Sequence, residues 1–155
     1  MKKVVELRDM AIYKEFSRRG SRKIRVQMTD HFNSEDYNEK PQILAYLKSG
    51  HMFHGWMQMV WDHFDKKNGF AVSDSLLTDG CWSWTNDLSY YVEKYDLILP
   101  AVFVEHMQSR NWEILNLDEL KDTFQFNADT FILCRSNWYE EVSEQDYIYT
   151  KNTHS

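Results

Sequence analysis

Apolar and polar residues along this chain recur with two different periods, and one of them is the alternation expected of β-strands. Over residues 22–28, every second position is apolar among charged or polar neighbours, which is typical of a half-buried strand. The apolar run TFILCR at 130–135 predicts a buried strand. We also expect an edge strand near 145–150.

Helical spacing dominates elsewhere. Pro41 at the start and Gly50 just past the end bound a predicted helix over 41–49. Apolar residues recur at three- and four-residue intervals in a second helix, which Thr85 or Asn86 begins and Tyr95 ends. Further helices are predicted at 9–19, at 100–110 after an extended link, and at 117–125 behind the capping residue Asn116.

Residues 51–64 are compatible with either period. Their apolar positions suit an amphipathic helix, but the run is rich in aromatic residues and is interrupted by Gly55. Asn68-Gly69 follows, and this pair between apolar runs is a strong hairpin signal. We therefore favour strand–turn–strand and leave the helix as the alternative.

The segment from Ser73 to Trp112 is the most informative. Trp82 and Trp84 would share one face of a strand, which we interpret as part of the core. Asp79 is expected to brace the preceding turn through an Asx hydrogen bond. Together these elements predict a single compact α+β domain over residues 1–155, with a small antiparallel sheet packed against several short helices.

Composition narrows the class of protein. Aromatic residues make up 15% of the chain, so a disordered chain is excluded although mean hydropathy is only −0.64. Cys81 and Cys134 are far apart, and we expect reduced thiols, with a disulfide left open. The N-terminal residues do not have the pattern of a signal peptide, and no apolar window reaches the ~18 residues of a membrane span. We expect a cytoplasmic protein with no membrane partner.

The net charge of −6 is unevenly distributed. Residues 1–25 hold nine Lys/Arg and three Asp/Glu, whereas residues 26–155 hold nine and 21. The basic segment 18–25 has the charge needed to bind nucleic acid, but it is short and the remainder would repel phosphate. We therefore do not expect a nucleic-acid partner. The acidic excess would steer a cationic partner toward the protein.

Signals for catalysis are weak. His51, His54 and His63 lie close together in sequence and are candidate metal ligands, but neither H-E-x-x-H nor a paired Cys-x-x-Cys accompanies them. Cys81 has no flanking motif of a nucleophile, and the chain has no glycine-rich phosphate loop. We expect no catalytic residue, no metal and no cofactor.

A set of short motifs spans residues 43–112: Tyr46–Gly50, Ser75–Gly80, Trp82 and Trp84, Asp87–Leu88, Tyr90–Tyr95, Leu99–Pro100, Phe103–Val104 and Asn111–Trp112. This pattern resembles small bacterial immunity proteins of toxin–immunity systems, including those of contact-dependent growth inhibition. Related proteins often have Pro after the second Trp, where this chain has Thr85. The resemblance implies a stoichiometric inhibitor and not an enzyme, and its partner would be a cognate toxin domain.

Toxic nuclease domains bind phosphate and are usually basic, so an acidic inhibitor would associate quickly and occlude the active site, with aromatic anchors slowing dissociation. We chose the candidate partner-binding residues by charge and expected exposure: Glu113, Asp118, Glu119, Asp122, Trp138, Tyr139, Glu140, Glu141, Glu144 and Asp146. The alternatives are a metal-dependent enzyme using His51, His54 and His63, and a nucleic-acid-binding or defence-related protein using residues 18–25.

Overall fold

A computed structural model of the chain describes residues 3–10, 13, 27–54, 59–65, 67, 72–73, 75–114, 116 and 131–136. The strands of its main sheet are β1 (Lys3–Asp9), β2 (His51–His54), β5 (Leu76–Thr78), β6 (Trp82–Thr85) and β7 (Phe131–Ser136). They lie in the spatial order β2-β5-β6-β1-β7. The strands β2, β5 and β6 pair antiparallel, whereas β1 runs parallel to β6 and to β7. The α+β class is confirmed, and the sheet is mixed where we expected only antiparallel pairs.

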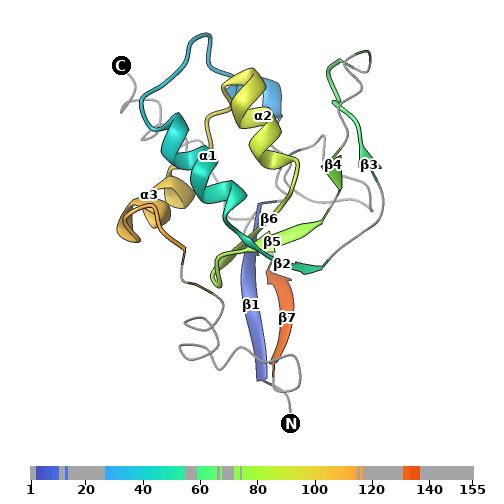
Figure 1. The fold of residues 1–155 in the computed structure, drawn as a ribbon, viewed down its shortest axis with the longest axis vertical. Coiled ribbons are helices and arrows are strands. Elements are labelled where there is room, and N and C mark those ends of the chain that lie inside the picture. Colours follow the sequence, from blue (N-terminus) through green and yellow to red (C-terminus); the bar gives the residue numbers. More distant parts are fainter. Residues whose placement is uncertain are drawn as a thin grey trace.

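A separate two-stranded ribbon joins β3 (Met59–Val60) to β4 (Val72–Ser73) in antiparallel register. Figure 1 shows it beside helix α2, away from β1 and β7. The described parts of residues 51–64 include the strands β2 and β3, so the strand interpretation holds there and the alternative helix is wrong. The antiparallel pairing of β3 with β4, on the other side of Asn68-Gly69, agrees with the favoured strand–turn–strand prediction. The strand predicted at 130–135 is confirmed as β7.

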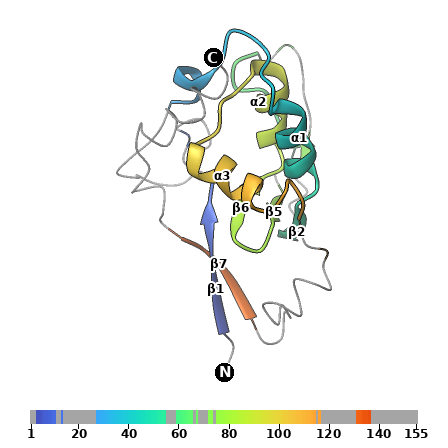
Figure 2. The same cartoon turned by 90° about the vertical axis from the view of Figure 1, so that its left-hand side faces the viewer.

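The helices are η2 (a 3-10 turn, Met28–His31), α1 (Lys40–Lys48), α2 (Leu88–Tyr95) and α3 (Ala101–Ser109). The three α-helices cluster at one end of the sheet, and β1 and β7 extend from the other end (Figures 1 and 2). All three were predicted. The start of α2 was placed too early, because Asp87 holds the N-cap position and Thr85 still belongs to β6.

The N-terminal region departs most from expectation. Strand β1 was not predicted, although Val5 and Leu7 alternate with two charged residues as a strand requires. The predicted helix at 9–19 is wrong at its start, since Asp9 ends β1. Met28 was assigned to a strand, but it begins the 3-10 turn η2, where its side chain is buried.

Gln27 is the extended N-cap residue of η2, and residues 22–26 of the predicted strand lie outside the described residues. So do the basic segment 18–25, the helix at 117–125 and the edge strand at 145–150.

The core is built around the two tryptophans of β6. The ring of Trp82 stacks on Phe103 of α3 with centroids 4.6 Å apart, and Trp84 contacts the same ring at 5.6 Å. The indole Nε1 of Trp84 donates to the carbonyl of Leu47 at 3.0 Å, which satisfies the polar atom of a fully buried side chain. The interpretation of both tryptophans as core residues is confirmed. No helix among the described residues is long and apolar enough to cross a membrane.

Candidate functional site

The turn between β5 and β6 places a buried carboxylate where three elements meet. Gly80 has a φ of 98°, a conformation that favours glycine, and this allows the chain to reverse tightly. Asp79 Oδ1 accepts hydrogen bonds from the backbone amides of Cys81 at 2.9 Å and Trp82 at 2.7 Å. The predicted Asx bracing of this turn is therefore confirmed.

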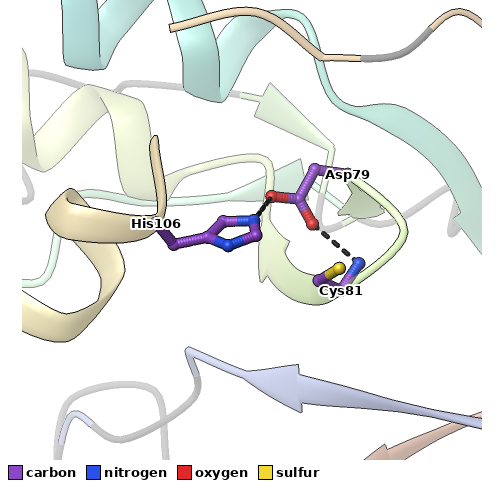
Figure 3. A group of neighbouring side chains, drawn as sticks. All are labelled: Asp79, Cys81 and His106. Carbon is purple, nitrogen blue, oxygen red and sulfur yellow. Dashed lines mark hydrogen bonds and ion pairs between the residues drawn. The ribbon is translucent and has the colours of Figure 1, made fainter. Parts of the chain in front are cut away.

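The second oxygen of Asp79 binds side chains from two helices. The hydroxyl of Tyr46 on α1 donates a hydrogen bond to Oδ2. His106 on α3 lies with its Nε2 2.9 Å from the same oxygen. Figure 3 marks this contact with a dashed line. We call Tyr46, Asp79, Cys81, His106 and Arg110 the Asp79 cluster. It ties α1 and α3 to the β5–β6 turn.

Burial alone would raise the pKa of the Asp79 carboxyl, because it disfavours the charged form. The hydrogen bonds from His106, Tyr46 and two backbone amides outweigh burial and hold that pKa below its usual range. The Tyr46 hydroxyl shifts in the opposite direction, since burial and the nearby Asp79 carboxylate both raise its pKa. Asp79 is therefore the ionised acceptor, and Tyr46 is a neutral donor.

Cys81 is also part of the cluster, but its surroundings do not activate the thiol as a nucleophile. Its Sγ accepts a hydrogen bond from Nη2 of Arg110 at 3.1 Å. Burial, reinforced by the Asp79 carboxylate, raises the pKa of the thiol despite this guanidinium. Reactive cysteines have a lowered pKa, because the thiolate is the attacking form. The arrangement therefore favours an unreactive thiol.

Oxygen, sulfur and nitrogen atoms of Asp79, Cys81 and His106 lie within 4.8 Å of one another, a grouping that can hold a metal ion. The surroundings oppose that use. A carboxylate offers about four lone-pair sites, and those of Asp79 already accept from two amides, Tyr46 and His106. The Arg110 guanidinium at the thiol would also repel a cation. We interpret the Asp79 cluster as a structural junction.

A second buried carboxylate, Asp62, follows β3 and binds helix α2. Its Oδ2 accepts from Tyr90 at 2.6 Å, Tyr95 at 2.7 Å and Lys94 Nζ at 3.1 Å. Its Oδ1 accepts from the amides of Phe64 and Asp65. We call these residues the Asp62 cluster. Burial would raise the pKa of Asp62, but the hydrogen bonds outweigh it and lower that pKa far below its usual range.

Three large apolar side chains are exposed in the part of the chain that the structure describes: Met52 at 62%, Trp61 at 58% and Phe64 at 36%. Trp61 and Phe64 belong to the segment that the Asp62 cluster holds. Sequence reasoning missed both, because it interpreted residues 51–64 by period and not by exposure.

The predicted partner-binding residues are mostly not placed. Glu113 is exposed shortly after α3. The others lie outside the described residues: Asp118, Glu119, Asp122, Trp138, Tyr139, Glu140, Glu141, Glu144 and Asp146. Whether the ten residues share a surface stays a prediction.

The histidines singled out as candidate metal ligands are not brought together among the described side chains. His51 lies on β2 and is half-buried, and His63 is exposed after β3. Neither belongs to a described group of potential metal ligands. The side chain of His54 lies outside the described ones. His106, which meets the Asp79 carboxylate, was not predicted, although it follows Phe103 by one helical turn and both rings face Trp82.

Comparison of the chain with protein-family models, with curated proteins and with solved structures finds no match. The function must therefore be argued from the residues and their geometry.

Proposed function

We propose that this chain is a cytoplasmic immunity protein, which binds a cognate bacterial toxin domain and neutralises it by occluding the active site. The proposed partner is a basic, nuclease-type domain, and the inhibition is stoichiometric. In this proposal the chain is a binding protein and not an enzyme.

The observation that carries the proposal is the exposure of Trp61 on a segment that the Asp62 cluster holds through several hydrogen bonds. Removing a large aromatic surface from water is favourable, so an indole that the fold itself leaves in solvent gains free energy when a partner covers it. Tryptophan is also among the residues enriched at the energetic centres of protein interfaces.

Charge supports the choice of a basic partner. The chain carries a net charge of −6, and exposed acids on the described surface include Asp30, Glu35, Asp36 and Glu105. Such a surface speeds the association of a cationic protein and disfavours association with phosphate. A nuclease domain, which must bind phosphate, presents the complementary sign.

The buried ionisable groups are consistent with a scaffold. Asp62 and Asp79 each have both oxygens engaged by several donors, and the Cys81 pKa is raised. Catalytic acids, bases and nucleophiles need a reactive lone pair or proton aimed at a substrate. These side chains instead fix the positions of α1, α2 and α3.

Co-expression tests the proposal. The toxin domain encoded in the adjacent reading frame is produced from an inducible promoter, with and without this protein. We expect restored growth, and a one-to-one complex when an inactivated toxin domain is mixed with the protein on a sizing column. Absence of any toxin beside this reading frame, or no complex with the one found, would contradict the proposal.

A further inference from the structure

The residues around Trp61 alternate sharply in exposure. Val60 is 3% exposed and Asp62 is 1% exposed, whereas Trp61 between them is 58% exposed. Three residues on, Phe64 is partly exposed, and its ring packs edge-on against Phe32, Tyr91 and Tyr95. The exposed Trp61 side chain is therefore close in sequence to Phe64, whose ring belongs to a packed group of aromatic rings.

The backbone that carries Trp61 is held before it by the pairing of Val60 with Val72 and after it by hydrogen bonds. The Tyr91 hydroxyl donates to the carbonyl of Trp61 at 3.5 Å and accepts from the amide of His63 at 3.1 Å. Asp62 accepts from the amides of Phe64 and Asp65 and from three side chains of α2. Binding then orders little besides the indole, and this small entropic cost is the advantage of a preorganised anchor.

We propose that Trp61 is the central anchor of the toxin-binding surface, with Phe64 at its border. This inference rests on the proposed function and places the energetic centre of the interface on the β3–α2 side. The residues chosen from sequence, Glu113 to Asp146, then contribute mainly to steering.

The partner is the cationic domain of the proposed function, and its surface would need an apolar pocket for the indole. Lys94, a cation at this site, lies 3.1 Å from Asp62 and over the rings of Tyr90 and Tyr95, so its charge is compensated locally. Exposed Asp30 lies two residues before Phe32, whose ring contacts Phe64. A second copy of this chain is a poor occupant, because two molecules with a net charge of −6 repel each other.

The test compares Trp61→Ala with Met52→Ala, a matched variant that removes another exposed apolar side chain. Each purified variant is bound to the inactivated toxin domain of the adjacent reading frame, immobilised on a sensor. We expect Trp61→Ala to weaken Kd by about 30-fold or more, mostly through faster dissociation, and Met52→Ala by less than about threefold. Both variants should keep the thermal midpoint of the wild type, since neither side chain is buried.

The outcomes separate the two proposals. A wild-type complex that Trp61→Ala leaves unchanged overturns the anchor assignment alone. Equal losses from the two variants also overturn it, because they indicate a general apolar effect. If the wild-type protein forms no complex, the proposed function is wrong, and the assignment of Trp61 as an anchor is wrong as well.

Discussion

His106 Nε2 lies 2.9 Å from Asp79 Oδ2, across 27 residues of sequence. The same oxygen accepts from Tyr46, so a single carboxylate holds one side chain from α3 and one from α1. The other oxygen closes the β5–β6 turn through two backbone amides. One ionised group therefore sets the positions of two helices relative to the sheet.

Replacing Asp79 should damage the fold more than its size suggests. Asp79→Ala leaves two amides, Tyr46 and His106 without their acceptor in a buried site, and we expect a loss of about 3 kcal/mol or more in the free energy of unfolding. Urea unfolding measures it. The control is Glu105→Ala, an exposed acid on α3, which should change stability by less than about 0.5 kcal/mol. Equal small losses would show that the Asp79 cluster is not a junction.

Stability should fall in acid. The folded-state pKa of Asp79 and that of Asp62 are both lowered from the ordinary 3.8, so the unfolded chain takes up these protons first as the pH drops. The stabilisation is fully present well above pH 3.8 and is lost progressively below it. Urea unfolding between about pH 3 and pH 7 should show this decline, and a shallower one for Asp79→Asn. Parallel curves for wild type and variant would contradict it.

Gly50 should tolerate no side chain. A Cβ there would lie 2.6 Å from Cζ2 of Trp84 and 2.9 Å from Cβ of Leu77. The indole cannot easily yield, because its Nε1 is bonded to the carbonyl of Leu47. We expect Gly50→Ala to cost about 1–3 kcal/mol of unfolding free energy. Gln42→Ala, at an exposed position of α1, should leave stability near the wild-type value, and an equally stable Gly50→Ala would refute the packing argument.

Zinc should not bind stoichiometrically. The lone pairs of Asp79 are occupied and Arg110 lies at the thiol of Cys81. Protein purified, incubated with zinc and desalted should therefore retain well below one equivalent by elemental analysis. One equivalent lost in Cys81→Ser would establish a metal centre in the Asp79 cluster. One equivalent lost instead in His51→Ala would favour the alternative metal-dependent enzyme.

The acidic residues should affect the association rate constant of the complex, and Trp61 should affect its dissociation rate constant. Changing Glu113, Glu140, Glu141 and Glu144 together to Gln removes part of the acidic excess, which in the proposed function steers association. We expect about a tenfold slower association with the toxin domain at low salt and little change in dissociation. Trp61→Ala should do the reverse. An unchanged association rate across ionic strengths would remove these acids from the steering surface.

The sequence predicted those features of the fold that depend on interactions between residues close together in the chain. Pro41 and Gly50 mark the ends of α1, and the Asx turn at Asp79 follows from residues three positions apart. The start of α2 was misplaced because the amide of Asn86 donates to Ser75 and Thr85 stays in the sheet. The start of α2 therefore depends on hydrogen bonds to a neighbouring part of the sheet. The helical spacing of the apolar residues does not indicate these bonds.

The sites depend on distant pairings that no local pattern encodes. Strand β1 pairs in parallel with β6, and Arg8 lies opposite Trp82, which is remote in sequence. No local pattern predicts this pairing, and the frequent charges of the N-terminal segment obscured the alternation of a strand. Asp62 meets Tyr90 and Tyr95 only because the β3 ribbon lies against α2. From sequence alone, Asp62 is one carboxylate among many, and Asp79 is recognisable only as the brace of its own turn. Their burial is what distinguishes them.

Whether the chain works by stoichiometric binding is tested most directly by titrating the activity of the toxin domain with the purified protein. The toxin concentration should exceed Kd by about tenfold or more, so that added inhibitor is almost fully bound. We expect activity to fall linearly and to reach zero at one mole of protein per mole of toxin. Full activity at several-fold excess, or loss of activity that grows with time below one equivalent, would contradict inhibition by binding.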